Sequence, residues 1–303
     1  MILLSILILA LIIIIHELGH FFMARMCKID VPELALGFGP KIGGVKYGNT
    51  DYNLRAIPLG GFCRLQGENT PEFKQYPAWK RLLVYAGGPL FNLTATFLAL
   101  FVFFFLVAGV PDAQSTVVGY AEDSALEKGD KIISIDGQKI SSWGEINSGT
   151  AVIERDGELL TKSINNETIL PPLSQHQFTD SLGASVHMIG MFTGAMVDAF
   201  SDGNAELSGP VGIVSATGDT AESSGMVGVL VMFATLNFSV ALVNLFPMPV
   251  LDGGHIALLG IEKIQNKPLS PKVEFIAHAV GVVGLLMIFL VATMGDLVSI
   301  VAN

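Results

Sequence analysis

Four runs of apolar residues, separated by more polar segments, dominate the pattern of this chain. A helix rises ~1.5 Å per residue and needs about 20 mostly apolar residues to cross a bilayer. Each run, with its flanking residues, is long enough for that. The pattern therefore predicts a polytopic α-helical membrane protein with about four transmembrane helices. The runs are Met1 to Ile15, Leu82 to Ala108, Met226 to about Leu245 and Phe275 to about Ile300.

Composition supports contact with a lipid bilayer. Of the 303 residues, 51% are hydrophobic and only 15% are charged, and the mean hydropathy is +0.58. These values are too apolar for an ordinary soluble domain. The runs divide the chain at residues 1–110, 111–170, 171–225 and 226–303. We expect two helices with their connector, a small β domain, a linker with an amphipathic helix, and the last two helices.

The distribution of charge predicts the orientation, because cytoplasmic loops next to membrane helices accumulate Lys and Arg. The connector from Arg25 to Arg81 holds nine of the 17 basic residues, and the connector after the third run adds three. The segment from Pro111 to Gly225 holds 17 acidic and five basic residues, a net charge of -12. We expect a multi-pass protein of the cell membrane, with both termini and this acidic segment outside. Its acidity argues against a nucleic acid as a partner.

The acidic segment contains a predicted small β domain. Short strands are expected at residues 117–120, 130–135, 138–140 and 151–155. An apolar, Met-rich stretch follows from Ser181 to Phe200. A fifth crossing there would reverse the third predicted span. We therefore predict an amphipathic helix on the outer surface.

A candidate metal-binding motif lies at the end of the first apolar run. It reads His16-Glu17-Leu18-Gly19-His20. Residues four apart share a helix face, so His16 and His20 can bind one metal ion while Glu17 stands beside them. Three polar groups inside a membrane helix cost several kcal/mol, which a metal site would offset. The motif predicts peptide hydrolysis at a zinc ion, and the alternative is a chance spacing of interfacial polar residues.

A zinc ion that hydrolyses peptides keeps three protein ligands and one open position, so a third ligand is required. Asp252 is the best candidate. It ends the third span, where Pro247 and Pro249 must break the helix. The predicted orientation places His16 and Asp252 at the same, cytoplasmic side of the membrane. The alternatives are an Asp-Gly turn at Asp252 and a ligand role for His255.

The chain resembles the site-2 proteases, which are intramembrane zinc metalloproteases, and in particular their bacterial branch with external PDZ domains. The resemblance covers most of the chain and rests on six motifs. They are HELGHFFMAR from His16, GFGP from Gly37, IPLGGF from Ile57, AGGPLFN from Ala86, LSGPVGI from Leu207 and NLFPMPVLDGGH from Asn244.

The resemblance implies a role for each matching residue. His16, His20 and Asp252 would bind Zn²⁺, and Glu17 would act as the general base that takes a proton from water. Asn244, with Pro247 and Pro249, would hold the substrate backbone near the metal. The substrates would be transmembrane protein segments, such as those of membrane-anchored anti-sigma factors or leftover signal peptides.

Two further regions fit the same resemblance. The residues on either side of Gly48-Asn49 predict a β-hairpin from Lys41 to Pro58, which is either a re-entrant loop beside the active site or a plain cytoplasmic hairpin. The sequence from Gly129 resembles the core of a PDZ domain. Few residues separate Trp143 from the strand at Ala151, where a PDZ domain places the helix of its peptide groove. We therefore expect a shortened PDZ-like domain.

Two other functions remain open on the sequence alone. A non-catalytic adaptor would bind client proteins through the hairpin and the external domain. A zinc or solute transporter would also contain broken helices and buried polar residues. Neither requires a carboxylate such as Glu17 beside a metal-bound water.

Overall fold

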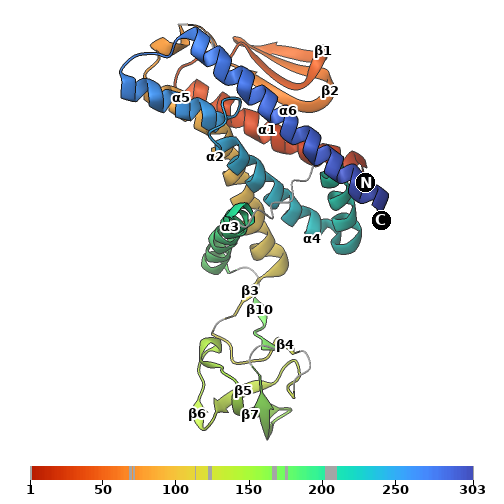
Figure 1. Ribbon diagram of the computed structural model, residues 1–303. Helices are drawn as coiled ribbons and strands as arrows, with labels where there is room; N and C mark the ends of the chain where they lie inside the picture. The colour runs from red at the N-terminus through yellow and green to blue at the C-terminus, as the bar shows by residue number, and fades with distance from the viewer. Residues whose placement is uncertain are drawn as a thin grey trace. The chain divides into compact units, whose positions relative to one another are not determined.

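A computed structural model describes residues 2–67, 70, 72–112, 114–121, 125–165, 169–174, 177–201 and 210–302. The motif from Leu207 falls partly outside them. Two compact units make up the chain. The helical unit comprises Met1–Leu100 and Ile189–Asn303, and the β unit comprises Phe101–Met188. Figure 1 shows the elements of each.

The described residues contain four helices that are long and apolar enough to span a membrane, which confirms the predicted number. The first two are α1 (Ile2–Met26) and α2 (Ala78–Val102), and a π-helix, η2 (Phe103–Ala108), continues the second. The others are α4 (Pro210–Leu245) and α6 (Pro271–Ala302). A shorter helix, α5 (Asp252–Gln265), lies between them in the chain.

The third spanning helix starts earlier than predicted. α4 begins at Pro210 instead of Met226, and its two parts meet at a kink at Gly225 (φ 59°, ψ -150°). Glycine adopts this positive φ at little cost, so the two helical parts join at Gly225 without an intervening loop. The expected helix at Ser181 to Phe200 is α3 (Phe178–Ser201), which is not among the four candidate spans.

The predicted hairpin is present and is longer than expected. β1 (Glu33–Tyr47) and β2 (Thr50–Arg64) pair across the turn at Gly48-Asn49. Glu33–Leu36 also pair with Gly61–Arg64, so the two strands fold over into several short segments. Gly37 and Gly60, both with positive φ, provide the bends. This folding places Gly61–Arg64 next to α1 and leaves them paired to β1 along the other side.

The base of the hairpin is anchored to the helices by an apolar core. Side chains from the end of α1, the start of β1, the end of β2 and α2 pack together there. A short 3₁₀ helix, η1 (Phe73–Gln75), closes this core. The buried members of this core are Phe21, Ala24, Cys27, Ile29, Val31, Leu65, Phe73 and Val84. The core fixes α1 against α2 just beyond the His16 motif.

The β unit holds a four-stranded antiparallel sheet of order β6-β5-β7-β8. Three of its strands match the expected positions: β5 (Lys131–Ile135), β6 (Gln138–Lys139) and β7 (Gly149–Arg155). β8 (Glu158–Ile164) was not predicted. Its sequence is mostly polar, and pairing with β7 along its whole length holds it in the sheet. The segment between β6 and β7 contains one 3₁₀ turn, η3 (Trp143–Glu145).

Two pairs of very short strands complete the β unit. β3 (Val110–Pro111) pairs with β10 (Leu173–Ser174), and β4 (Tyr120–Ala121) pairs with β9 (Ile169–Leu170). They bring the start and the end of the unit together. The chain therefore leaves the β unit close to where it enters.

Candidate metal centre

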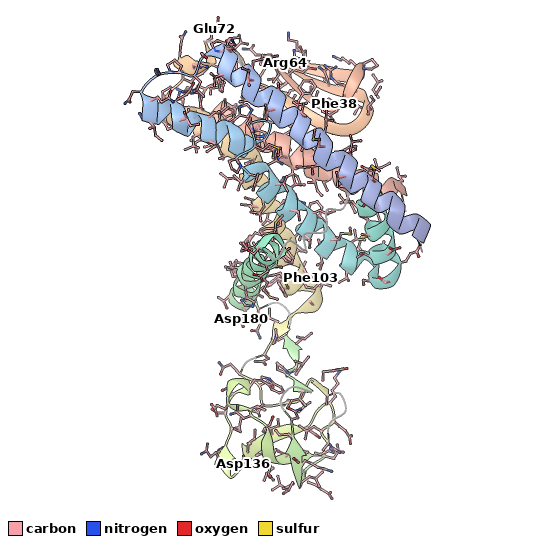
Figure 2. All side chains as sticks on the ribbon, in the orientation of Figure 1. Phe38, Arg64, Glu72, Phe103, Asp136 and Asp180 are labelled. Atoms are coloured by element: carbon pink, nitrogen blue, oxygen red, sulfur yellow. The ribbon has the colours of Figure 1, made fainter. Side chains whose placement is uncertain are left out.

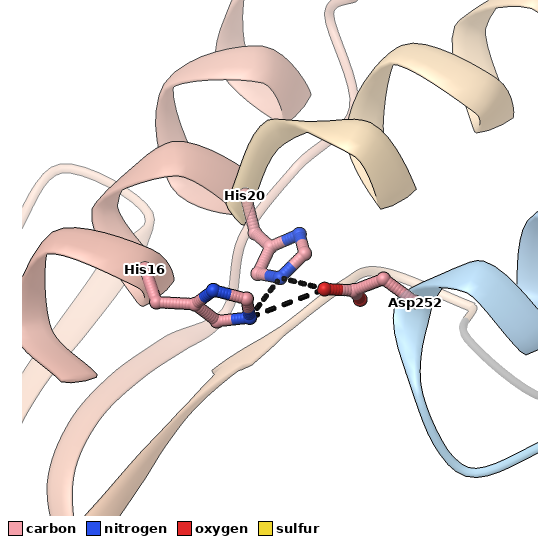
Figure 3. Close-up of side chains that lie close together, drawn as sticks. All are labelled: His16, His20 and Asp252. Atoms are coloured by element: carbon pink, nitrogen blue, oxygen red, sulfur yellow. Dashed lines mark hydrogen bonds and ion pairs between the residues drawn. The ribbon is translucent and has the colours of Figure 1, made fainter. Parts of the chain in front are cut away.

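Three side chains predicted as metal ligands meet at one point in the helical unit. Nε2 of His16 lies 3.1 Å from Oδ2 of Asp252, Nε2 of His20 lies 3.4 Å from the same oxygen, and the two nitrogens are 3.2 Å apart. Figure 3 shows this triangle. Zinc with bonds of ~2.0–2.1 Å in a tetrahedral site separates its ligand atoms by ~3.3 Å. The three atoms thus have the spacing of three ligands at one face of a zinc tetrahedron.

Helix geometry places the two histidines, and a broken helix places the aspartate. His16 and His20 are one turn apart on α1, and their rings meet edge to face with centroids 4.8 Å apart. α4 ends at Leu245, and α5 begins at Asp252 after the two prolines. Gly254 lets the chain turn tightly, since a Cβ there would lie 2.4 Å or less from the Met248 carbonyl group. The predicted helix break is therefore present, and Asp252 starts a helix.

The hydrogen bond of His20 fixes which ring nitrogen faces the metal position. Nδ1 lies 2.8 Å from the carbonyl oxygen of Val84 on α2. A carbonyl only accepts, so Nδ1 donates its proton, and a neutral ring then presents the lone pair of Nε2. Oδ2 of Asp252 is buried without a hydrogen-bond donor among the described residues. A cation between these three atoms would satisfy their converging lone pairs.

Helix α2 leaves space for that cation. A Cβ atom on Gly88 would lie 2.5 Å from Nε2 of His20 and 2.7 Å from Nε2 of His16. At the preceding residue of α2, Gly87 packs on Gly19, and the absence of side chains lets the backbones of α2 and α1 touch. The arrangement of donor atoms and the space kept open by Gly88 therefore both fit a zinc ion.

Glu17 stands at the junction of two cavities. One, of about 710 Å³, is also lined by His20, Asp252 and His255. The other, of about 370 Å³, is mostly apolar and lies between α1 and the hairpin, with Ile13 and Leu54 in its wall. The backbone N–H of Cys63 on β2 donates a hydrogen bond to the Glu17 carboxylate. A water molecule in the larger cavity can thus reach both Glu17 and the ligand triangle.

The remaining predicted residues lie near Asp252 in the chain without joining the triangle. Asn244 is in the last turn of α4, and its amide Nδ2 donates 2.9 Å to the carbonyl oxygen of Val240. Pro247 and Pro249 lie in the loop that precedes α5. His255, the alternative to Asp252 as a ligand, is outside the three-residue cluster. Its ring stacks on Tyr85 with ring centroids 4.8 Å apart.

The sequence interpretation did not assign roles to Val84 and Gly88. Gly88 lies in the AGGPLFN motif of the second span, and Val84 lies two residues before that motif. A pair of small residues in an apolar helix is typical of close helix packing, and this signal was available. The carbonyl of Val84 had no such signal, because any residue provides one.

Comparison with known proteins agrees with this geometry. The model of peptidase family M50 matches residues 4–288. A Clostridium perfringens protein, assigned by name as a zinc metalloprotease, is 31% identical over 325 residues, which cover 94% of this chain and 95% of that protein. Similarly named proteins of Fusobacterium nucleatum and Brucella suis are 29% and 28% identical, covering 97% and 90% of this chain and 97% and 89% of their own.

These matches extend over nearly the whole chain, including both parts of the ligand triangle. They agree with the four apolar helices, which fit a multi-pass membrane protein. The chain therefore belongs to peptidase family M50, the family of the site-2 proteases, and is a zinc-dependent metallopeptidase.

Proposed function

We propose that this protein is an intramembrane endopeptidase that cuts transmembrane segments of other membrane proteins. In this proposal His16, His20 and Asp252 bind the zinc ion, and Glu17 is the general base. The observation that carries it is the position of the ligand triangle. Two of its members belong to α1, well inside a candidate span that runs from Leu3 to Met26. A peptide bond that reaches this site would be cut at membrane depth.

Peptide hydrolysis needs a base, an acid and a polarised carbonyl group. Zinc, when bound, supplies Lewis acidity that polarises the carbonyl and makes a water molecule more acidic. Glu17 takes a proton from that water as the water oxygen bonds to the carbonyl carbon. The carbon–nitrogen bond then breaks, and Glu17 returns the proton to the leaving amine nitrogen. One carboxylate therefore serves as base and then as acid, and its position beside His16 and His20 supports both roles.

A helical substrate must unwind before its carbonyl is accessible, because intrahelical hydrogen bonds cover the backbone. The edge of β2 at Gly61–Arg64 runs beside Glu17 and could pair with an extended peptide. The apolar cavity next to it would accept large apolar side chains of a membrane segment. We further propose that Asn244, with Pro247 and Pro249, supports the substrate backbone from the other side, near Asp252.

The orientation is part of the proposal. The excess of Lys and Arg in the connectors supports a site that faces the cytoplasmic side, with both termini and the β unit outside. The substrates would then be cut near the cytoplasmic end of their membrane segments. Membrane-anchored regulators and signal-peptide remnants are the expected classes.

Cleavage of a panel of single-span model proteins in detergent tests the proposal. We expect the wild type to cut some of them, a zinc chelator to stop cutting, and Glu17→Gln to reduce the rate about 10²- to 10⁴-fold with the zinc content unchanged. Glu158→Gln, on an exposed part of β8, is the matched control and should cut normally. Wild-type protein that holds zinc and cuts nothing in a varied panel would favour the adaptor function instead.

A further inference from the structure

One buried amide beside the ligand triangle has an unusual environment. Asn92 on α2 is fully buried, and its Nδ2 lies 3.5 Å from Nδ1 of His16. Its Oδ1 is buried and has no hydrogen-bond partner among the described residues. A buried amide inside an apolar helix is costly when its oxygen is left unpaired. Its position against His16 suggests a partner.

The role of His16 determines which amide atom should face it. If Nε2 of His16 binds zinc through its lone pair, the neutral ring carries its proton on Nδ1. That N–H needs an acceptor, and the NH₂ group of Asn92 cannot accept. The oxygen and nitrogen of an amide occupy nearly equivalent positions, so a half-turn of the amide places Oδ1 where Nδ2 stands. The same half-turn gives the buried oxygen a donor.

We propose that Asn92 is a positioning residue for the zinc site, whose amide oxygen accepts a hydrogen bond from Nδ1–H of His16. It does for His16 what the carbonyl of Val84 does for His20. The inference rests on the assignment of His16 as a zinc ligand. It adds a side chain that orients the ligand without touching the metal.

The spacing along α2 supports this assignment. Val84, Gly88 and Asn92 are four residues apart, so they lie along one face of the helix. The first offers an acceptor to His20, the second leaves room at the metal position, and the third faces His16. One face of α2 thus cradles the two histidines of α1.

Zinc affinity of the full-length protein in detergent, measured by competition with a chelator, tests the role of Asn92. Asn92→Leu keeps the branched heavy-atom skeleton of the side chain and removes the acceptor, and we expect its zinc affinity to fall about 10- to 100-fold. Asn92→Asp keeps an acceptor, so we expect its affinity to stay within a few-fold of the wild type. A purely structural role would give the opposite ranking, because a carboxylate is harder to bury than Leu in an apolar helix.

Thr96→Val is the matched control. Thr96 is fully buried one turn further along the same face, and its hydroxyl donates to the carbonyl oxygens of Asn92 and Ala234. Its replacement removes a buried hydrogen bond from α2 without removing the acceptor for His16, so zinc affinity should not change.

Two results would overturn the inference: Asn92→Leu binding zinc as tightly as the wild type, or Asn92→Asp losing as much affinity as Asn92→Leu. A thermal melt of each variant checks that it is folded, and the Asp variant still decides the question if the Leu variant does not fold. Wild-type protein that fails to bind zinc would contradict the metal site itself, which is a separate outcome.

Discussion

The helical unit exposes the kind of side chain that the β unit buries. In the β unit, ten apolar residues form one core, including Ile132, Ala151 and Ile153, each at most 1% exposed. In the helical unit, large apolar side chains such as Leu3 (70% exposed) and Phe275 (73%) face outward, while Asn92 and Asn237 are fully buried. Figure 2 shows the side chains of both units. The exposed apolar side chains of the helical unit fit contact with lipid.

This difference indicates which buried side chains are candidates for a functional site. In water, burial of apolar surface stabilises the fold, so buried apolar residues need no further explanation. In a bilayer, apolar side chains can face lipid at no cost, and a buried polar group needs a partner or a role. Among the described residues of the helical unit, His16, His20 and Asp252 bring their polar atoms to one point, which is the candidate metal centre.

The largest expected effect that would sharpen this comparison of the two units comes from adding a single methyl group to the helical unit. Gly88→Ala places a Cβ 2.5 Å from Nε2 of His20 and 2.7 Å from Nε2 of His16, the proposed zinc ligands. The ligands must shift, and we expect the cleavage rate to fall about 100-fold or more. Gly260→Ala on α5 is the control, because a Cβ there meets nothing within 4 Å. Equal rates for both variants would contradict the assigned position of the metal.

A core substitution in the β unit should damage that unit alone. Ile153→Ala removes a fully buried side chain from β7 and should cost roughly 2–5 kcal/mol. Hydrogen exchange of the full chain should then show loss of protection in β5 to β8, with an unchanged zinc content. Leu159→Ala is the control, because Leu159 on β8 is 67% exposed. Loss of zinc from the Ile153 variant would contradict the separation of the two units.

The smallest expected effect is a pH dependence in the β unit. The guanidinium of Arg155 donates two hydrogen bonds of 2.7 Å to Asp130 and holds the pKa of that carboxyl below its usual range. Since the unfolded chain binds the proton more readily, this stabilisation is complete above the unfolded pKa of ~3.9 and is lost as pH falls through the folded pKa.

Hydrogen exchange of β5 and β7 between pH 6 and pH 3 measures this effect. Protection should fall towards pH 3 in the wild type. Asp130→Asn should have lower protection at pH 6 and a flatter profile. An identical profile in the two proteins would show that the pair with Arg155 does not stabilise the unit.

The meeting of the three candidate ligands could be predicted from the sequence because their placement follows local rules. The spacing of His16 and His20 is a helix rule, and the break before Asp252 follows from two prolines. The charge of the connectors then predicted that the two parts share one side of the membrane. In the structure the ligand atoms of His16, His20 and Asp252 lie within 4.8 Å of one another.

The surroundings of the centre could not be predicted in the same way. The folding of β1 and β2 into several segments depends on pairs such as Leu34 with Cys63, which are far apart in the chain. The acceptors for the two histidines come from α2, and only the packing of α1 on α2 determines which residues face them. β8 was missed because its stability comes from β7 more than from its own residues.

The zinc content of purified full-length protein tests the central claim most directly. Wild type should hold one zinc ion per chain, Asp252→Ala should lose it, and Asp130→Asn, a carboxylate change in the β unit, should keep it. Glu17→Gln should also keep its zinc while losing activity. Asp252→Ala protein that binds zinc with wild-type stoichiometry and affinity would contradict the account, because the metal would then be held elsewhere.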